Sequence, residues 1–440
     1  MDLLRLFNKY PRSTSRYDVY PGFAQWSKEL DVDSYYQQLE RSVASSGELS
    51  LYTHIPYCRS ICSFCGCNFK MTESVSEVAQ YVDSVLLEWA NYRQRFGSNI
   101  KLTSNYLGGG TPTFLAPALL EKLLAGLLDG ITTADNYTST VEVDARSIDS
   151  EQVKVLADFG VKRAIIGVQD FNVDVLKNVG RDQTTSQLWS VVKKLQQKNI
   201  TDLAMEFIYG LPWQTASSFK QNIGGVCDSG VDTVCLYPLA SVPWLKKIQA
   251  VYGEYTPLAA PEKLNLYLEM AECLDKTGYL HIGWGYFIKS GSSLHQQYQQ
   301  GMVSRDVTGL KFNRSDTLIG LGASALSYSN SCMIKNDNIT DSYIHKMAKA
   351  KSAVSIGVSR TESDQLLAAL YDQLFRSGKI SQDSMADLDL SANSRELLQQ
   401  LSNDLVVELT DGQLALTPDG THLIETVFMM LDPNNQRDYE

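Results

Sequence analysis

Short apolar runs alternate with segments of helical periodicity from Leu51 to about Phe287. Alternating strands and helices favour parallel strands joined by right-handed βα units. We therefore predict an α/β fold, a partial (β/α)6-type barrel, in which chemistry takes place at the carboxyl ends of the strands. The expected strands cover residues 50–55, 104–107, 140–144, 163–168, 202–209, 233–239 and 279–282, and the expected helices cover residues 76–96, 116–128, 150–159, 184–198, 217–226 and 261–277.

The last hundred residues follow a different pattern. Residues 362–375 and 393–405 have the spacing of amphipathic helices. Residues 406–416 resemble a hairpin that turns at Asp411-Gly412, and a final helix is expected at 418–431. These elements predict a mostly helical, winged-helix-like C-terminal domain packed over the barrel mouth. The expected regions are an N-terminal extension that wraps the barrel (1–49), the barrel (50–290), a connecting and substrate-site segment (291–350) and the C-terminal cap (351–440).

The charge balance restricts the partners of the chain. Its 440 residues carry a formal net charge of −11, whereas nucleic acids and membrane surfaces require basic patches, so we expect neither partner. No apolar stretch of about 18 residues or more is present, so no transmembrane helix is predicted. The N-terminus lacks the apolar core of a signal peptide, and free cysteines suit a reducing compartment. We therefore predict a cytoplasmic protein.

Three cysteines, Cys58, Cys62 and Cys65, have the spacing C-x3-C-x2-C. Thiolates are the usual ligands of a [4Fe–4S] cluster, and a complete protein set has four. Three would leave one iron open to S-adenosylmethionine (SAM), which can chelate it through its amino and carboxylate groups. An electron from the cluster then cleaves a C–S bond of SAM and releases a 5′-deoxyadenosyl radical. The cofactor supplies this chemistry, and the protein orients it.

Structural zinc is the main alternative for these thiols. Zinc sites usually combine two pairs of Cys or His ligands, whereas Cys227, Cys235, Cys273 and Cys332 are isolated in apolar-looking segments. No second pair completes a zinc site. A disulfide framework is not expected in a large chain without a secretory leader.

Small and polar residues follow the second and third predicted strands. Gly109, Gly110 and Thr111 come directly after the second strand, where glycine lets backbone amides approach a ligand closely. A tight structural turn is the alternative for these glycines. Glu142 ends the third strand, where a carboxylate can bind ribose hydroxyls or an ammonium group.

Three further polar residues occupy corresponding places. Gln169 ends the fourth strand, and Arg181 follows shortly after it as a candidate partner for the methionyl carboxylate of SAM. Glu206 is a charge within an apolar strand, and such a charge is rarely buried without a partner. Each is a weak signal alone, but their shared placement predicts one site.

Several motifs occur together in one order: the run from Tyr52 to Asn68, then Gly-Gly-Gly-Thr-Pro-Thr, Glu-Val-Asp, Gly-Val-Gln-Asp-Phe-Asn and Ile-Tyr-Gly-Leu-Pro. In this order they resemble the oxygen-independent coproporphyrinogen III oxidase family of radical SAM enzymes, over most of the chain. The resemblance implies an oxidoreductase that converts two propionates of coproporphyrinogen III to vinyls, giving protoporphyrinogen IX in haem biosynthesis. Cys67 is characteristic of the true oxidase branch.

The resemblance also implies roles for individual residues. Cys58, Cys62 and Cys65 would ligate the cluster and Cys67 would not, while no residue is assigned a catalytic role. One or two SAM molecules would bind beside the cluster. The residues expected to hold them are Tyr52, Phe64, Gly109, Gly110, Thr111, Glu142, Gln169, Arg181, Glu206, Ala240 and Leu326.

Partners follow from the same resemblance. The substrate would be a tetrapyrrole, the reductant flavodoxin or ferredoxin, and the enzyme a monomer. Because the substrate is a tetra-acid and the chain is acidic, local basic residues would have to bind it. Arg16, Lys70 and Arg181 are candidates, although surface solvation is the simpler role for Lys70.

The chain departs from the family pattern on the substrate side. Glu206 stands where the family has aspartate, Gly285 and Tyr286 replace an Asp-His pair, Val307 and Thr308 replace Phe-Gln, and Leu326 replaces isoleucine. The alternatives are a divergent radical SAM enzyme that performs methyl transfer or haem modification, and a haem-binding carrier without catalysis. Only five histidines could serve such a carrier.

Overall fold

The computed structural model describes residues 3–10, 19–97, 100–240, 246–253, 255, 258–312, 315–388 and 390–432. A sheet with the strand order β14-β13-β12-β11-β1-β2-β3-β4-β5-β6-β8-β7 forms the centre. Within this sheet, β1 to β6 lie side by side in the order of the sequence and are parallel, as the alternating pattern predicts. They are β1 (Glu48–Ile55), β2 (Lys101–Gly109), β3 (Thr132–Val143), β4 (Arg163–Gln169), β5 (Asp202–Tyr209) and β6 (Thr233–Pro238).

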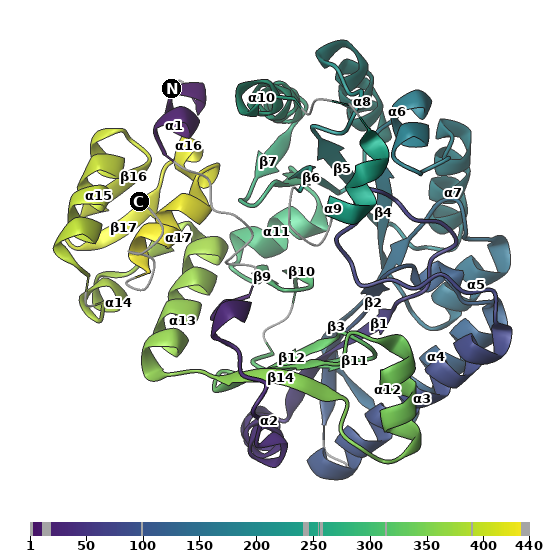
Figure 1. Ribbon diagram of the computed structural model, residues 1–440. Helices are drawn as coiled ribbons and strands as arrows, with labels where there is room; N and C mark the ends of the chain where they lie inside the picture. The colour runs from purple at the N-terminus through teal and green to yellow at the C-terminus, as the bar shows by residue number, and fades with distance from the viewer. Residues whose placement is uncertain are drawn as a thin grey trace.

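Helices alternate with these strands and cover the outside of the sheet (Figure 1). The first, α3 (Val75–Phe96), begins at Ser74, whose hydroxyl accepts from the Glu77 N–H, and buries Tyr81 and Trp89 on one face. The predicted helices are confirmed, and α6 and α9 are additional. The others in this part are α4 (Pro117–Leu128), α5 (Ser150–Asp158), α6 (Val173–Asn178), α7 (Thr185–Gln197), α8 (Ala216–Ser229), α9 (Lys246–Gln249) and α10 (Ala260–Lys276).

The seventh predicted strand does not continue the parallel series. β7 (Tyr279–His281) lies at the sheet edge and pairs antiparallel with β8 (Tyr286–Lys289), and β8 pairs antiparallel with β6. The chain reverses between them at Gly283 and Gly285, with φ of 101° and 73°. These left-handed angles favour glycine and close a tight turn. Expecting a further parallel strand here was therefore wrong.

The other edge of the sheet is built from late segments of the chain. β11 (Leu318–Leu321) pairs parallel with β1, and β12 (Leu326–Tyr328), β13 (Cys332–Asn336) and β14 (Val354–Ser359) follow in antiparallel order. The predicted boundary at residues 350 and 351 therefore cuts through one sheet. α12 (Thr340–Ala348) lies against α3, and α2 (Val32–Ser46) contacts β13, β1 and α3.

A buried carboxylate on α3 joins this late edge to the barrel. Glu88 accepts hydrogen bonds from the Gly322 N–H at 2.8 Å and from Asn336 Nδ2 and Tyr343 Oη, both at 2.7 Å. Burial nevertheless raises the pKa of Glu88 to about 7, against the effect of these donors. Three donors on one buried group fix the position of β11 and β13 relative to α3.

The C-terminal unit combines helices with a small sheet of order β15-β17-β16. Its hairpin turns at Asp411 and Gly412, as predicted, and its composition is compatible with a winged-helix-like fold. The final predicted helix is divided near His422. Its elements are α13 (Glu362–Ser377), β15 (Lys379–Ile380), α14 (Gln382–Ala386), α15 (Ala392–Asn403), β16 (Val407–Thr410), β17 (Gln413–Leu416), α16 (Pro418–Thr421) and α17 (Ile424–Leu431).

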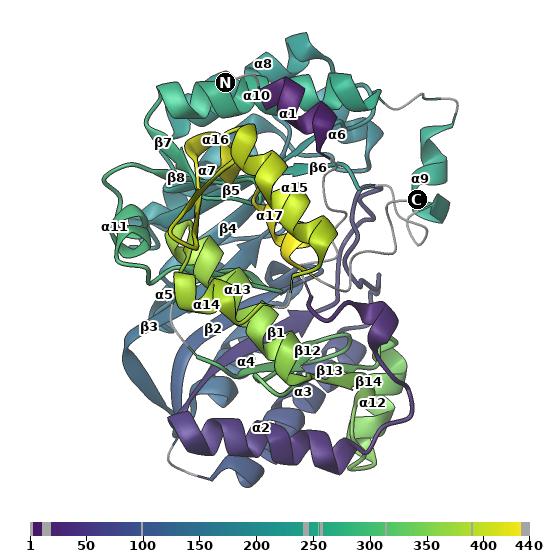
Figure 2. The ribbon, with the colours of Figure 1, turned by 90° about the vertical axis from the view of Figure 1, so that its left-hand side faces the viewer.

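The described N-terminal residues hold the C-terminal unit beside the barrel (Figure 2). α1 (Leu3–Lys9) contacts α10, and Arg5, Lys9 and Tyr10 all bond the Asp404 carboxylate. Between the two parts lie α11 (Ser293–Gln299) and a hairpin of β9 (Ser304–Asp306) and β10 (Gly309–Lys311), visible at the centre of Figure 1. The N-terminal extension therefore contacts the cap as well as the barrel.

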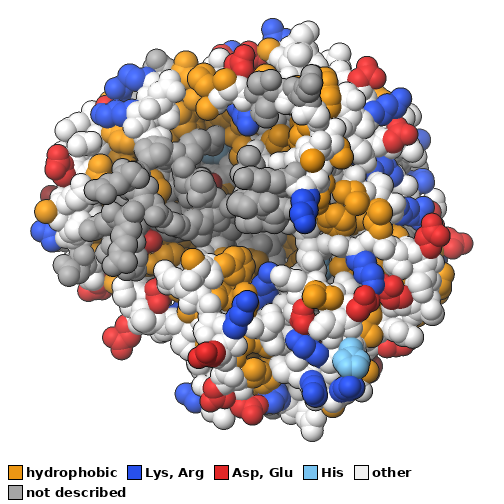
Figure 3. All heavy atoms as spheres, in the orientation of Figure 1, with side chains coloured by type: hydrophobic (Ala, Val, Ile, Leu, Met, Phe, Trp, Pro, Cys, Tyr) orange, Lys and Arg blue, Asp and Glu red, His pale blue; other side chains and the backbone are white. Residues whose placement is uncertain are grey.

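Charge is mixed over the surface. On the face in Figure 3, Lys and Arg side chains are interspersed with Asp and Glu. Within the described segments, every helix is too short or too polar to cross a lipid bilayer.

Candidate active site

The loop after β1 carries the clustered cysteines and is fixed at both ends. The Cys58 N–H donates to the Lys70 carbonyl at 3.2 Å, and the Lys70 N–H donates to Pro56 at 2.6 Å. In the middle, the Ser63 N–H donates to the Val179 carbonyl at 2.9 Å. Backbone bonds thus hold the loop against the segment that follows α6, at the carboxyl edge of the sheet.

The loop faces a cavity of about 260 Å³ at the carboxyl ends of the parallel strands. Cys58, Cys62 and Cys65 all line it, and so does the more exposed Cys67. The structure brings most of the expected SAM-binding residues to the same cavity: Phe64, Gly109, Gly110, Thr111, Glu142, Gln169, Arg181, Glu206 and Ala240. The carboxyl ends of the parallel strands therefore bring these side chains to one cavity.

The thiols fit an iron–sulfur cluster better than a single ion. Among the described residues, no three or more His, Cys, Asp or Glu side chains converge on one point, as a zinc site would require. Each thiolate of a [4Fe–4S] cluster binds a different iron, so its cysteines surround a volume instead. A cavity lined by three cysteines on one tight loop meets that requirement.

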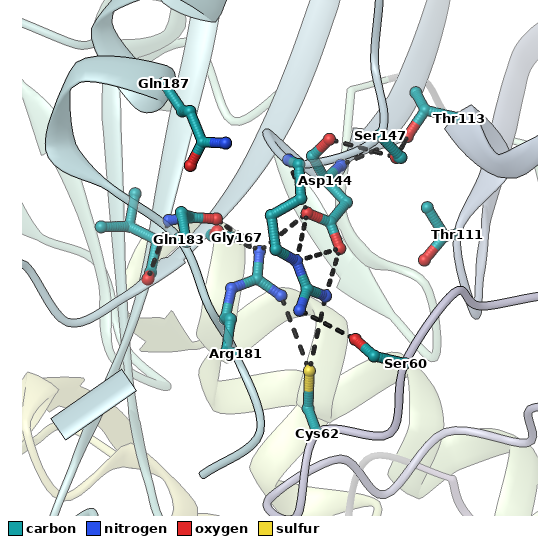
Figure 4. Close-up of polar contacts among 12 residues, drawn as sticks. Ser60, Cys62, Thr111, Thr113, Asp144, Ser147, Gly167, Arg181, Gln183 and Gln187 are labelled. Carbon is teal, nitrogen blue, oxygen red and sulfur yellow. Dashed lines mark hydrogen bonds and ion pairs between the residues drawn. The ribbon is translucent and has the colours of Figure 1, made fainter. Parts of the chain in front are cut away.

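Two arginines contact the Cys62 thiol, and Asp144 pairs with both of them on the side away from the sulfur (Figure 4). Arg146 Nη2 lies 3.6 Å and Arg181 Nη1 3.9 Å from Cys62 Sγ. Arg146 also binds Asp144 Oδ2 at 2.6 Å and donates to Ser60 Oγ at 3.0 Å. Donors directed at a ligating sulfur raise the reduction potential of a cluster, since they stabilise added electron density.

Sequence reasoning missed Asp144 and Arg146 as site residues. They stand two and four positions after Glu142, just past the end of β3. Burial opposes ionisation of Asp144, but Arg181 and Arg146 outweigh it and lower its pKa to about 2. The sequence did contain a signal. Asp144 and Arg146 are an acidic and a basic residue directly after β3, the strand that carries the candidate residue Glu142.

Glu142 lies deeper in the cavity, between neighbouring strands. It accepts from Tyr106 Oη at 2.7 Å and from the Gly109 N–H at 3.0 Å. Burial, followed by repulsion from Glu206, raises the pKa of Glu142 to about 8. Burial likewise raises the pKa of Glu206 to about 7, although Arg181 opposes the shift. Two neighbouring carboxyls thus resist ionisation on the cavity wall.

The glycines after β2 serve the turn as well as the cavity. A Cβ atom on Gly109, whose φ is 112°, would lie 2.5 Å from the His54 ring. A Cβ atom on Gly110 would lie 2.8 Å from the backbone of Pro56. The glycine loop must therefore pack directly on the end of β1, which supports the structural alternative alongside a ligand role.

Some expected residues lie elsewhere. Tyr52 bonds His54 Nδ1 at 3.0 Å, and Leu326 packs with Val19 and Met333 on the late edge of the sheet; neither lines the cavity. Lys70 pairs with Asp341 at 2.6 Å and with Glu77 at 3.1 Å. Arg16 falls outside the described residues.

A second cavity of about 250 Å³ adjoins the first and shares Glu142, Ile165, Glu206 and Tyr237 with it. It contains the departures Tyr286, Val307 and Thr308. At Gly285 a Cβ atom would lie 2.2 Å from the Leu236 carbonyl oxygen, so this backbone has no room for the family's acidic side chain. Tyr286, Val307 and Thr308 therefore line the adjoining cavity and not that of the cysteines, whereas Glu206 lines both and Leu326 neither.

The raised pKa of Glu206 predicts a pH-dependent stability. Below about pH 4.5 the carboxyl is protonated in both the folded and the unfolded protein. As pH rises towards about 7 the unfolded protein ionises first, so the contribution of Glu206 to the free energy of unfolding is lost. Glu206→Gln cannot ionise. We expect its free energy of unfolding, relative to the wild type, to be higher at pH 8 than at pH 5 by on the order of 1 kcal/mol. Urea denaturation of the cluster-free protein measures this difference. The exposed Glu121→Gln should show no such gain, and an equal effect at both pH values for Glu206→Gln would contradict this account.

Comparison with known proteins agrees with this geometry. Residues 52–223 match the Radical SAM superfamily. The chain is 27% identical to the oxygen-independent coproporphyrinogen III oxidase of Escherichia coli K12, covering 98% of this chain and 94% of the relative. It is also 27% identical to the Bradyrhizobium diazoefficiens protein of that name, covering 96% and 95%.

A solved structure of coproporphyrinogen III oxidase from Escherichia coli, described as a radical SAM enzyme, superposes with a TM-score of 0.88 at 26% identity over 98% of both chains. With three loop cysteines and an α/β barrel, these matches define a radical SAM enzyme, a class that uses a [4Fe–4S] cluster and SAM. Within that class, the chain is similar along nearly its whole length to the oxygen-independent coproporphyrinogen III oxidases.

Proposed function

We propose that the chain oxidatively decarboxylates propionates of coproporphyrinogen III to vinyls, giving protoporphyrinogen IX. The observation that carries this proposal is the single cavity that holds Cys58, Cys62 and Cys65 together with the strand-end residues. The full-length relatives carry the name of this activity, and the fold agrees along the whole chain.

The position of each residue on the cavity determines its proposed role. Cys58, Cys62 and Cys65 would hold the cluster, and Arg146 and Arg181 would stabilise the sulfur of Cys62. When bound, the cluster and SAM supply the 5′-deoxyadenosyl radical that removes a β-hydrogen from a propionate, after which carbon dioxide and one electron leave. The glycine loop, Glu142 and Glu206 would orient SAM at the strand ends.

The other SAM-binding assignments remain part of the proposal. Phe64, Gln169 and Ala240 would contact the cofactor from the cavity wall, whereas Tyr52 and Leu326 would act from outside the described cavity. The first SAM molecule would bind in the cavity of the cysteines, and a second would have to use the adjoining one.

We further propose a cytoplasmic monomer that receives electrons from flavodoxin or ferredoxin. The free cysteines and an oxygen-sensitive cluster support a reducing compartment.

The carrier alternative gains no support from the histidines. His54 bonds the Asn68 carbonyl at 2.9 Å, His281 stacks on His422 at 4.0 Å, and none of the five lines either cavity. Haem carriers need an axial ligand, for which histidine is the commonest choice. The described cavities therefore offer no histidine for haem.

Anaerobic turnover tests the proposed reaction. Reconstituted enzyme, SAM, a reductant and coproporphyrinogen III should yield vinyl product with deoxyadenosine formed in proportion, measured by liquid chromatography and mass spectrometry. Omitting SAM provides the control. Deoxyadenosine without any vinyl product would exclude the reaction, and a methylated product would select methyl transfer.

A further inference from the structure

A third cavity, of about 590 Å³, lies between the β9–β10 hairpin, β12 and α13. These elements meet near the centre of Figure 1, between the barrel and the C-terminal unit. Its size falls within the range of about 300–1,000 Å³ typical of small-molecule sites. Four cationic side chains line it, namely Arg305, Lys311, Arg360 and Arg376.

Lys311 enters this cavity without a carboxylate partner among the described residues. Its Nζ donates to the Ser315 carbonyl and lies 3.2 Å from Tyr328 Oη. Burial lowers the pKa of Lys311, although Asp306 opposes the shift. A buried ammonium normally pairs with an anion, because desolvation of the charge is costly.

Arg360 is held in the same way by neutral groups. It donates to the Tyr20 carbonyl at 2.7 and 3.2 Å and to the Ser329 carbonyl at 3.1 Å. These bonds position the guanidinium on neutral acceptors, and Asp364 favours its charge only from a distance. Burial lowers the pKa of Arg360 accordingly.

Three acids also line the cavity, Asp306, Asp316 and Asp372, and each favours the charged form of Lys311 from a distance, but none forms an ion pair with it among the described residues. Asp306 accepts from the Thr308 N–H at 2.8 Å and from Tyr328 Oη at 2.7 Å, both neutral donors. Asp372 pairs with Arg376 at 2.7 Å. Lys311 and Arg360 therefore face the cavity with neutral acceptors, an arrangement that suits a ligand carrying carboxylates.

The cation-lined cavity adjoins the second cavity, which in turn adjoins the proposed active site. It has Arg305 and Val307 in common with the second cavity, which in turn shares Glu142 and Glu206 with the cavity of the cysteines. Val307, where the chain departs from the family, stands in the β9–β10 turn and lines both the second cavity and the cation-lined cavity. A large ligand could thus react near the cysteines while its acidic groups lie among the cations.

We propose that the cavity at Lys311 and Arg360 binds the carboxylate arms of the substrate that are not reacting. This assignment rests on the proposed function for the identity of the substrate as a tetrapyrrole tetra-acid. It makes Lys311 and Arg360 determinants of substrate binding, and it replaces Lys70, whose charge is neutralised by Asp341 and Glu77.

Binding of coproporphyrin III to the anaerobically reconstituted holoenzyme tests this site. Lys311→Met should raise the dissociation constant about tenfold, as loss of one charge-assisted hydrogen bond predicts. Lys311→Arg should retain binding. Lys335→Met is the matched control, because Lys335 is a partly buried lysine on neighbouring β13 that stacks on Phe23 outside the cavity. Coproporphyrin III tetramethyl ester, which has no charge, should bind wild type and Lys311→Met equally.

The outcomes separate this inference from the proposed reaction. Equal affinity of wild type and Lys311→Met for the tetra-acid, or no binding by wild type, would overturn the cavity assignment. Lys311-dependent binding without any vinyl product in turnover would contradict the reaction alone and support the cavity as a carboxylate site. Iron content measured on each variant verifies that the holoenzyme has formed.

Discussion

Replacing Cys62 with alanine is expected to remove the iron–sulfur cluster and reduce SAM cleavage to the detection limit. Cys62 is one of three loop thiols on the cavity, and a cluster held by only two thiolates lacks a ligand for a further iron. The variant should be nearly colourless after anaerobic reconstitution. Iron and sulfide analysis, together with deoxyadenosine release, measures the effect.

Cys67→Ala provides the matched control for this experiment. Cys67 lines the same cavity and follows Cys65 by two residues, yet the resemblance to the family implies that it ligates no iron. It should keep its cluster and its ability to cleave SAM. Equal loss of iron from Cys67→Ala and Cys62→Ala would contradict the assignment of three ligands.

Asp144→Ala is expected to lower the free energy of unfolding by about 3–5 kcal/mol, the range for removing one partner of a buried ion pair. The Asp144 side chain is 12% exposed and lies 2.6 Å from Arg146 and 3.6 Å from Arg181. Its loss would leave two neighbouring guanidinium groups without a counter-ion. Urea denaturation of the cluster-free protein measures the change.

An exposed ion pair supplies the comparison for Asp144. Asp83 pairs with Lys122 on the surface, with side chains 58% and 48% exposed. Exposed pairs contribute little, so Asp83→Ala should leave the unfolding midpoint nearly unchanged. Similar losses of unfolding free energy for Asp83→Ala and Asp144→Ala would show that the ion-pair network beside Cys62 stabilises the fold no more than an exposed pair does.

The parallel half of the sheet could be predicted because each strand is an apolar run followed by a helical pattern. β11 to β14 could not be predicted in the same way. They are three to six residues long and lie far along the chain from β1, against which β11 pairs. Short buried strands carry no alternation, and tertiary contacts fix their place, among them the pairing of β11 with β1 and the hydrogen bonds to Glu88.

The site was predictable wherever a residue stands at the end of a parallel strand. Glu142, Gln169 and Glu206 meet at one edge because the topology requires it. Leu326, expected from the resemblance alone, stands outside this pattern, since β12 is antiparallel and the side chain packs in a separate apolar cluster. Arg146 was missed because its contact with Cys62 depends on the fold of two distant loops.

The central claim is that three thiolates leave one iron open to SAM. Electron–nuclear double resonance on the reduced holoenzyme, with SAM labelled by ¹⁵N in its amino group and ¹⁷O in its carboxylate, tests it directly. The account predicts hyperfine coupling of both labels to the cluster. An intact cluster without either coupling, or a colourless protein that carries zinc at these thiols, would contradict it.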